Sequence, residues 1–310
     1  MRSAPEARVS PLAGLVVAIL AVSTSAILVT WSEAPSLVKA FYRVLFTLAL
    51  VAPVAFTRNR GDFARLGSRD LFFAAVAGAA LALHFASWFE SLNWTSVAAS
   101  VTLVQAQPLF VALGAWALLD ERVTGRTVVG IAIALVGIVV MSLGDFLTGA
   151  AVVGDDPLYG NALAVVGAVT AAGYVLAGRS IRQRVALFPY VTVVYGVCAL
   201  VLLALVVARG LPLLDYPRRE WLLFAAMALG PGLFGHTVIN WALAHLESSV
   251  VSVSLLGEPV GSTLLALVLL SQVPTPATLA GGAVVLGGIY VTTGARRADP
   301  PGDGARAVDD

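Results

Sequence analysis

Long apolar stretches dominate this sequence and limit what it can fold into. A helix that crosses the hydrocarbon core of a bilayer needs about 20 mostly apolar residues. Between its charged clusters the chain contains ten such stretches, at residues 12–30, 36–56, 70–90, 97–119, 125–143, 158–178, 187–208, 220–244, 250–271 and 276–294. The sequence therefore predicts an all-α polytopic membrane protein with ten transmembrane helices. The first stretch is long for the apolar region of a signal peptide and nine more follow, so we interpret it as a retained helix.

The composition excludes several other classes of protein. The chain has 310 residues, of which 59% are hydrophobic and 12% are charged, whereas soluble domains are about 25% charged. A soluble enzyme and a disordered chain are both excluded, because each needs more polar surface. The net charge of +1 indicates no nucleic-acid partner. The single cysteine, Cys198, can form neither an intramolecular disulfide nor a cysteine metal site.

The arginines predict the orientation of the chain in the membrane. If the N-terminus is cytoplasmic, fourteen of the nineteen basic residues fall in cytoplasmic segments, three in one outer loop (Arg209, Arg218, Arg219) and two within the second span (Lys39, Arg43). Basic residues are concentrated on the cytoplasmic side of membrane proteins. We therefore expect a multi-pass protein of the inner (plasma) membrane with both termini in the cytoplasm.

The two halves of the chain are related by an internal repeat. A shift of 151 residues aligns Leu92 with Leu243, Gln107-Pro108 with Glu258-Pro259, Gly130 with Gly281, and Gly137 with Gly288. Because each half holds five spans, an odd number, the second half enters the membrane from the opposite side, and the chain is predicted to be a pair of inverted repeats. The expected segments are an N-terminal tail (1–11), the first repeat (12–143), an outer connecting loop (144–157), the second repeat (158–294) and a disordered cytoplasmic tail (295–310).

The second repeat carries the residues of a known family. They are Ala242-Leu243, Glu247-Ser248-Ser249, Leu256-Gly257-Glu258-Pro259-Val260, Gly281-Gly282 and Gly287-Gly288. The first repeat echoes them in Ser91-Leu92, Thr95-Ser96-Val97-Ala98, Gln107-Pro108 and Asp120-Glu121-Arg122. With these motifs the chain resembles the ten-helix drug/metabolite transporter superfamily, and specifically its EamA-type exporters. It departs from many relatives in having Gln107 where they also carry glutamate.

The resemblance implies a secondary transporter with a central cavity lined by both repeats. Such proteins export amino acids, other metabolites or drugs, so a small-molecule metabolite is the expected partner besides the lipid bilayer. It implies no bound cofactor, and the sequence contains no pattern of metal ligands or catalytic residues.

Apart from charges at the first or last two residues of a span, three charged residues lie within predicted spans. A basic residue at the bilayer centre is costly and must face water, a partner or the headgroups. Lys39 lies about one turn from the outer end, where it can extend to the headgroups. Arg43 lies deeper, where it faces either the cavity or an ion-pair partner; a cavity position would favour substrates with a carboxylate or another anionic group. Glu258 is expected near mid-membrane, about nine residues into its span, and has either a functional role or only a structural hydrogen bond.

Other polar side chains could complete a substrate site. Histidine titrates near neutral pH, so His84 and His236 join Glu258 as candidates for proton coupling, against the alternative of a neutral, hydrogen-bonded histidine. Further candidates for stacking or hydrogen bonding to substrate are Trp88, Asn93, Tyr174, Tyr195, Asn240 and Trp241.

Prolines and glycines predict irregular helices. Residues 230–235 fit the GxGxxG pattern, but no strand precedes them, so we interpret Gly230, Pro231 and Gly232 as a broken or bent helix rather than a dinucleotide site. Pro108 and Pro259 are likewise expected to break or kink their helices. The heptad-spaced glycines Gly130, Gly137, Gly281 and Gly288 predict close helix packing.

We therefore expect an exporter of small metabolites, with amino acids as the leading candidate, that works by alternating access around a midplane cavity. Protons are the candidate coupling ion. An importer or exchanger of small organic anions is the main alternative, and an intramembrane enzyme or a structural membrane protein is a further one.

Overall fold

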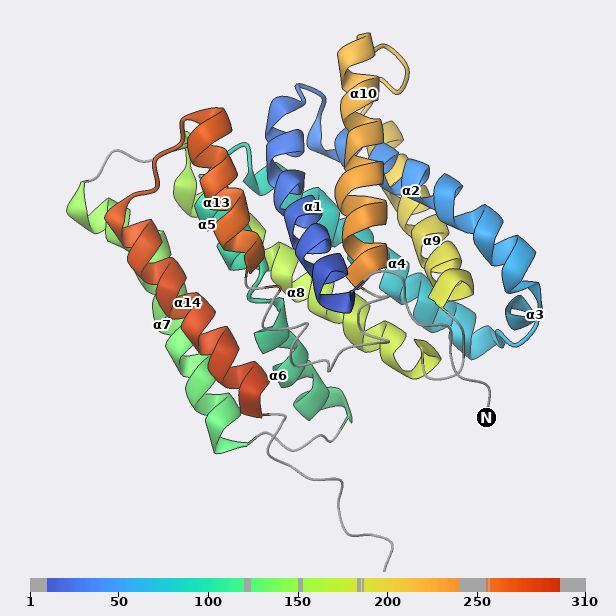
Figure 1. Cartoon of the computed structure of the whole chain (residues 1–310), viewed down its shortest axis with the longest axis horizontal. Helices are drawn as coiled ribbons and strands as arrows, with labels where there is room; N and C mark the ends of the chain where they lie inside the picture. The colour runs from blue at the N-terminus through green and yellow to red at the C-terminus, as the bar shows by residue number, and fades with distance from the viewer. Residues whose placement is uncertain are drawn as a thin grey trace, which may run out of the picture.

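A computed structural model describes residues 10–119, 124–149, 153–182, 185, 187–239, 255 and 257–295. In chain order its helices are α1 (Pro11–Trp31), α2 (Ser36–Arg58), α3 (Arg60–Phe63), α4 (Ser68–Ser91), α5 (Val97–Val104), α6 (Gln107–Leu119), α7 (Gly125–Thr148), α8 (Pro157–Arg182), α9 (Leu187–Ala208), α10 (Arg218–Met227), the π-helical η1 (Ala228–Thr237), α13 (Gly257–Leu270) and α14 (Pro276–Ala295). They form one bundle, with α7 and α14 along one side and α2 and α9 toward the other (Figure 1).

The bundle has the dimensions and surface of a membrane protein. In its described part six helices are long and apolar enough to cross a bilayer, and three shorter apolar helices accompany them. Large apolar side chains cover the outside, as at Leu20 (62% exposed) and Val268 (76% exposed). A surface this apolar is typical of a protein in contact with lipid. The prediction of an all-α polytopic membrane protein is confirmed.

The fourth predicted span is broken at Pro108, as expected. The fourth divides at Gln105-Ala106 into α5 and α6, and α6 begins at Gln107-Pro108. Glu258 and Pro259 likewise lie in the first turn of α13 instead of inside a long helix. Proline lacks the N–H that an interior turn needs but fits the first turn, where no intrahelical partner exists. The two equivalent prolines therefore start helices in both repeats.

The Gly230–Pro231–Gly232 segment has the irregular backbone that its sequence predicts. It lies in η1, a π-helical continuation of α10 with Pro231 inside it. Since proline removes one backbone donor, the wider π turn accommodates the interruption without ending the helix.

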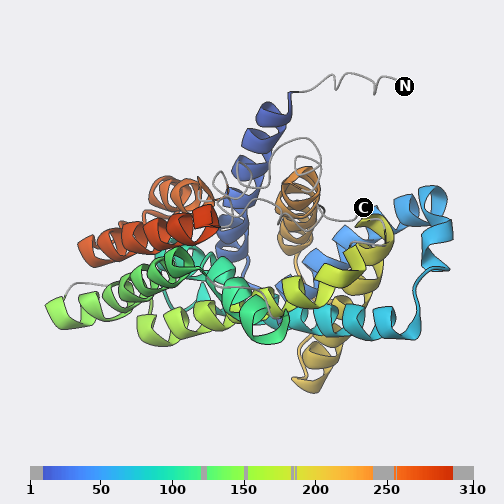
Figure 2. The same cartoon turned by 90° about the horizontal axis from the view of Figure 1, so that it is seen from below.

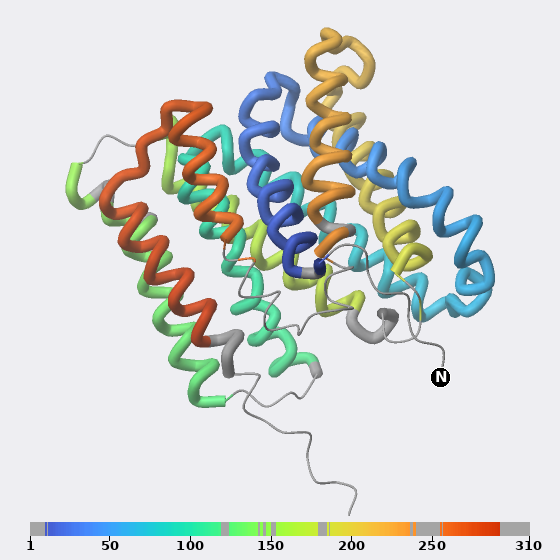
Figure 3. The backbone as a smooth tube through the Cα atoms, in the orientation of Figure 1, coloured from blue at the N-terminus to red at the C-terminus, as the bar shows by residue number. Residues whose placement is uncertain are grey.

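Helices α7 and α14 pack backbone to backbone through glycine, and they run side by side in Figure 3. A Cβ added at Gly137 would come within 2.7 Å of the Gly281 carbonyl oxygen, and one added at Gly288 within 2.6 Å of the Gly130 oxygen. The 151-residue shift converts the first of these pairs into the second. The predicted close packing is confirmed, and the contacts are those expected for two repeats related by a two-fold axis between α7 and α14.

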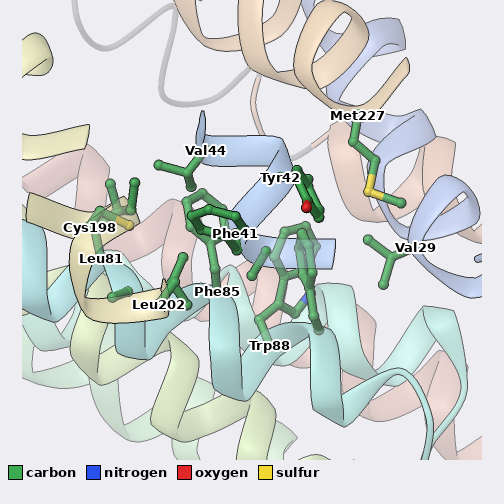
Figure 4. Packing of buried hydrophobic residues seen from close by; sticks show 14 of the residues in the cluster. Val29, Phe41, Tyr42, Val44, Leu81, Phe85, Trp88, Cys198, Leu202 and Met227 are labelled. Carbon is green, nitrogen blue, oxygen red and sulfur yellow. The ribbon is translucent and has the colours of Figure 1, made fainter. Parts of the chain in front are cut away.

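The remaining helix pairs follow the same arrangement. Helix α2 packs on α9, the helix at the equivalent place in the second half. The packing of α4 on α8 corresponds to the packing of η1 on α1. In Figure 2, α4 and α8 lie in the same layer of the bundle. Between α2, α4 and α9 lies an apolar cluster that includes Phe41, Phe85, Cys198 and Leu202 (Figure 4). It surrounds the polar side chains described next.

Candidate functional site

Arg43 is a buried cation in the interior of α2, 3% exposed. One guanidinium nitrogen donates a hydrogen bond of 2.8 Å to Ser25 Oγ on α1. Its Cζ lies 4.7 Å from the centroid of the Phe85 ring and 5.5 Å from that of Phe89, both on α4. Aromatic faces attract cations, and most strongly where water is excluded. A hydroxyl and aromatic faces thus surround this charge in the apolar interior.

Glu258 is a half-buried carboxylate in the first turn of α13. Gln105 Nε2, at the break between α5 and α6, donates to its Oε2 over 2.6 Å. The turn is tied to α1 as well, because Ser262 Oγ donates to the Ser23 carbonyl over 3.0 Å. The carboxylate from the second repeat is therefore held by an amide from the first.

Arg43 and Glu258 lie within electrostatic range of each other. Arg43 also lies within electrostatic range of Tyr195 on α9, and Tyr195 within that of Tyr174 on α8. Both tyrosines are half-buried, as is Glu258. The structure thus brings together a cation, a carboxylate and phenol groups from both repeats. We call Arg43, Glu258, Tyr174, Tyr195 and His84 the central cluster.

His84 joins this cluster from α4. Its Nδ1 lies 2.9 Å from the Gly167 carbonyl oxygen on α8. A carbonyl only accepts hydrogen bonds, so Nδ1 carries the hydrogen. The imidazole stacks on Trp88, with centroids 5.7 Å apart and planes 23° apart. Arg43 lies within electrostatic range of the imidazole.

Two residues singled out in the sequence lie away from the central cluster. We define the Trp31 end of the bundle as the one where α1 ends and α2 begins. Asn93 lies exposed at this end, where its Nδ2 donates to Ser36 Oγ over 3.1 Å and to a Glu90 oxygen over 3.2 Å. Lys39 Nζ donates to the Val29 carbonyl oxygen over 3.0 Å.

The burial of Lys39 corrects its expected extension to the headgroups. The residue is only 3% exposed. The last carbonyls of a helix lack intrahelical partners and attract cations, so the end of α1 holds the ammonium. Arg219 binds the same helix end, because its guanidinium donates a hydrogen bond of 2.8 Å to the Trp31 carbonyl oxygen.

The positions of three other predicted site residues relative to the central cluster lie outside the described structure. Asn240 and Trp241 lie outside the described residues, and the side chain of His236, although its backbone belongs to η1, does so too.

Sequence reasoning missed the hydrogen-bonding partners of the two deep charges. Gln105 stands two residues before the Gln107 that the repeat singles out, and Ser25 ends a Ser23-Thr24-Ser25 run in the first span. The sequence feature that could have identified them is a polar side chain within an apolar stretch. The missed Glu220, 3% exposed, accepts a hydrogen bond from Ser32 Oγ and one of 3.1 Å from the Glu33 N–H at the end of α1.

Comparisons with known proteins agree with this architecture. The model of the EamA-like transporter family matches residues 10–143 and 158–294. Two proteins of Archaeoglobus fulgidus, each described as an uncharacterized transporter, are similar to the chain. The first is 29% identical over 273 aligned positions, and the match covers 81% of this chain and 92% of the relative. The second is 26% identical over 260 residues, 82% of this chain and 86% of the relative.

A solved structure described only as that of a protein shares the fold. It has a TM-score of 0.59 at 23% identity and covers 94% of this chain and 100% of its own. The family match spans most of the sequence, in agreement with the resemblance seen in the motifs. The chain therefore belongs to the EamA-like transporter family and is a transporter, not an enzyme.

Proposed function

We propose that this transporter exports small metabolites, and amino acids in particular, by alternating access around the central cluster. The observation that carries the proposal is that Arg43 and Glu258, two opposite charges from different repeats, lie within electrostatic range of each other inside the bundle. Ionisable groups at such depth are rare and mark substrate pathways. A zwitterion is the ligand whose charges complement both.

The two charges assign an orientation to the substrate. Its carboxylate would face Arg43, and its ammonium group would face Glu258 and the phenol groups of Tyr174 and Tyr195. Because the charges belong to different repeats, a substrate bound to both would hold the repeats together. Movement of one repeat against the other would then expose the site to each side in turn.

Exchange with protons is the proposed driving force, with Glu258 as the proton carrier. A protonated carboxyl group is neutral and no longer attracts an ammonium ion. Proton and substrate would therefore compete for Glu258, and we expect the apparent affinity for amino acids to fall as pH is lowered on the side where they bind. His84 is the weaker candidate, because its Nδ1 already donates to the Gly167 carbonyl and its ring stacks on Trp88; His236 remains a candidate.

The proposed setting is the inner membrane, with the Trp31 end outside and both termini in the cytoplasm. Arg58, Arg60, Arg65 and Arg69 border the opposite end of α2 and α4, in keeping with the concentration of basic residues on the cytoplasmic side. The two stretches matched by the family model support the proposed repeat boundaries, 12–143 and 158–294.

Counterflow in proteoliposomes tests this function. Vesicles preloaded with one unlabelled amino acid at a time should accumulate the labelled form when they contain the wild-type protein. We expect Arg43→Gln and Glu258→Gln each to reduce the initial rate at least tenfold. The matched controls Arg209→Gln and Asp215→Asn, which remove the same charges at exposed positions, should transport normally. Absence of counterflow for every amino acid, with and without a pH gradient, would exclude this substrate class.

The second candidate, transport of small organic anions, is favoured by Arg43 alone. An anion without an ammonium group would be repelled by Glu258. Glu258→Gln should then accelerate anion uptake while Arg43→Gln abolishes it. Loss of transport in both variants favours the amino acid.

A further inference from the structure

Trp88 has a buried hydrogen-bond donor without an acceptor. The side chain is 4% exposed, and its indole Nε1 has no hydrogen-bond partner in the described part of the chain. Buried polar groups are nearly always paired, and one without a partner destabilises the fold. A site that binds a ligand can keep such a donor, because the ligand supplies the acceptor.

The indole ring is held in place from two sides. It stacks on His84 at 5.7 Å and meets the Phe89 ring edge-on, with centroids 5.3 Å apart. Figure 4 shows Trp88 beside Phe85, rising from α4 toward α2. The hydroxyl of Thr30, the other unpartnered buried group among the described residues, can rotate toward a carbonyl of its own helix. The N–H of a rigid, packed indole cannot turn in this way.

The unpartnered donor belongs to the surroundings of the deep cation. The guanidinium Cζ of Arg43 lies 5.9 Å from the centroid of the Trp88 ring. An anionic oxygen at Arg43 would therefore lie within the reach of a second, neutral donor. Hydrogen bonds to charged acceptors are stronger than those between neutral groups, so a carboxylate satisfies this donor better than a neutral acceptor would.

We propose that Trp88 Nε1 donates a hydrogen bond to the carboxylate of the transported amino acid and so makes the site selective for carboxylate over amide. The inference rests on the proposed function and assigns a specificity-determining role to one atom. Arg43 attracts any anion, whereas the fixed direction of the indole N–H selects an acceptor oxygen at one position. An uncharged carboxamide would lose most of the attraction of Arg43 and gain little from this donor.

An atom-sized replacement tests the role. In the full chain, Trp88 is replaced by β-(3-benzothienyl)alanine, in which sulfur stands in place of the indole N–H while the ring shape is kept. The same replacement at Trp116, whose side chain is 59% exposed on the outer surface, is the matched control. Binding is measured by calorimetry in nanodiscs, first with L-leucine and L-leucinamide, then with each other amino acid and its amide. Trp88→Phe is the second variant, and thermal melting verifies that every variant is folded.

We expect the benzothienyl variant at Trp88 to bind the amino acid about tenfold more weakly, because it loses a hydrogen bond to a charged group. Its binding of the amide should not change. The control should match the wild type. Unchanged amino-acid binding would mean that a water molecule satisfies the indole, and equal losses for acid and amide would mean a structural role; either result overturns the inference. If the wild-type protein binds none of the amino acids, the proposed function fails before Trp88 is tested.

Discussion

At the scale of single residues, the two deep charges depend on different kinds of partner. Arg43 has a hydroxyl and the faces of aromatic rings, whereas Glu258 has the amide of Gln105. Both charges could be identified from the sequence, because a charge inside an apolar span is rare and costly. Their partners could not, since isolated serines and glutamines occur in many helices and only the fold decides which of them meets a charge.

The hydrogen bond from the Gln105 amide to Glu258 should stabilise the folded protein. Gln105→Leu keeps most of the side-chain volume but leaves the carboxylate without its donor, which should cost about 1–3 kcal/mol. Removing both partners together is less damaging than removing one, so Gln105→Leu combined with Glu258→Leu should melt closer to the wild type while remaining inactive in transport.

Thermal unfolding in detergent measures both effects. Gln107→Leu is the matched control, because no hydrogen bond of the Gln107 amide appears in the described structure. If Gln107→Leu lowers the melting temperature as much as Gln105→Leu does, the hydrogen bond to Glu258 does not account for the loss.

At the scale of helices, the sequence predicts where the helices lie better than how they are interrupted. The apolar runs mark where helices lie, because the bilayer sets their length. The break before Gln107 and the start of α13 at Gly257 lie where Pro108 and Pro259 were expected to break or kink their helices. A proline in an apolar run fits either a kinked helix or the first turn of a new one, and contacts with other helices decide between them.

The glycine contact between α7 and α14 gives a prediction at this scale. A Cβ at Gly281 would come within 2.6 Å of the Met141 backbone nitrogen, while one at Gly287 on the same helix meets nothing within 4 Å. Gly281→Ala should therefore separate the helices and destabilise the protein by about 1–3 kcal/mol. Gly287→Ala should be neutral or slightly stabilising, because alanine favours the helix. Equal melting temperatures for the two variants would contradict backbone-to-backbone packing.

At the scale of the whole molecule, the repeats explain why the site is assembled as it is. The helix pairs α2–α9 and α7–α14 come from equivalent places in the two halves, and Arg43 and Glu258 come one from each half. The sequence predicts this relation through the 151-residue shift. It does not predict that Asn93 lies apart, because a position near a span end fits both a loop and a site.

The orientation of the molecule can be measured by labelling. In a Cys198→Ser background, single cysteines replace Asp215, in the α9–α10 loop, and Gly61, in the α2–α4 connection; both residues are exposed. A membrane-impermeant maleimide should label Asp215→Cys in intact cells and Gly61→Cys only after permeabilisation. The opposite pattern would reverse the proposed orientation.

The central claim is that Arg43 and Glu258 together recognise a zwitterion, and the most direct test compares ligands that differ in one charge. Binding of L-leucine, of 4-methylpentanoate, which lacks the ammonium group, and of isoamylamine, which lacks the carboxylate, is measured on the purified wild type, Arg43→Gln and Glu258→Gln. We predict that the wild type binds leucine at least tenfold more tightly than either analogue, that Arg43→Gln loses the preference over the amine, and that Glu258→Gln loses the preference over the acid. Equal binding of leucine and one analogue by the wild type, or preferences that survive both substitutions, would contradict it.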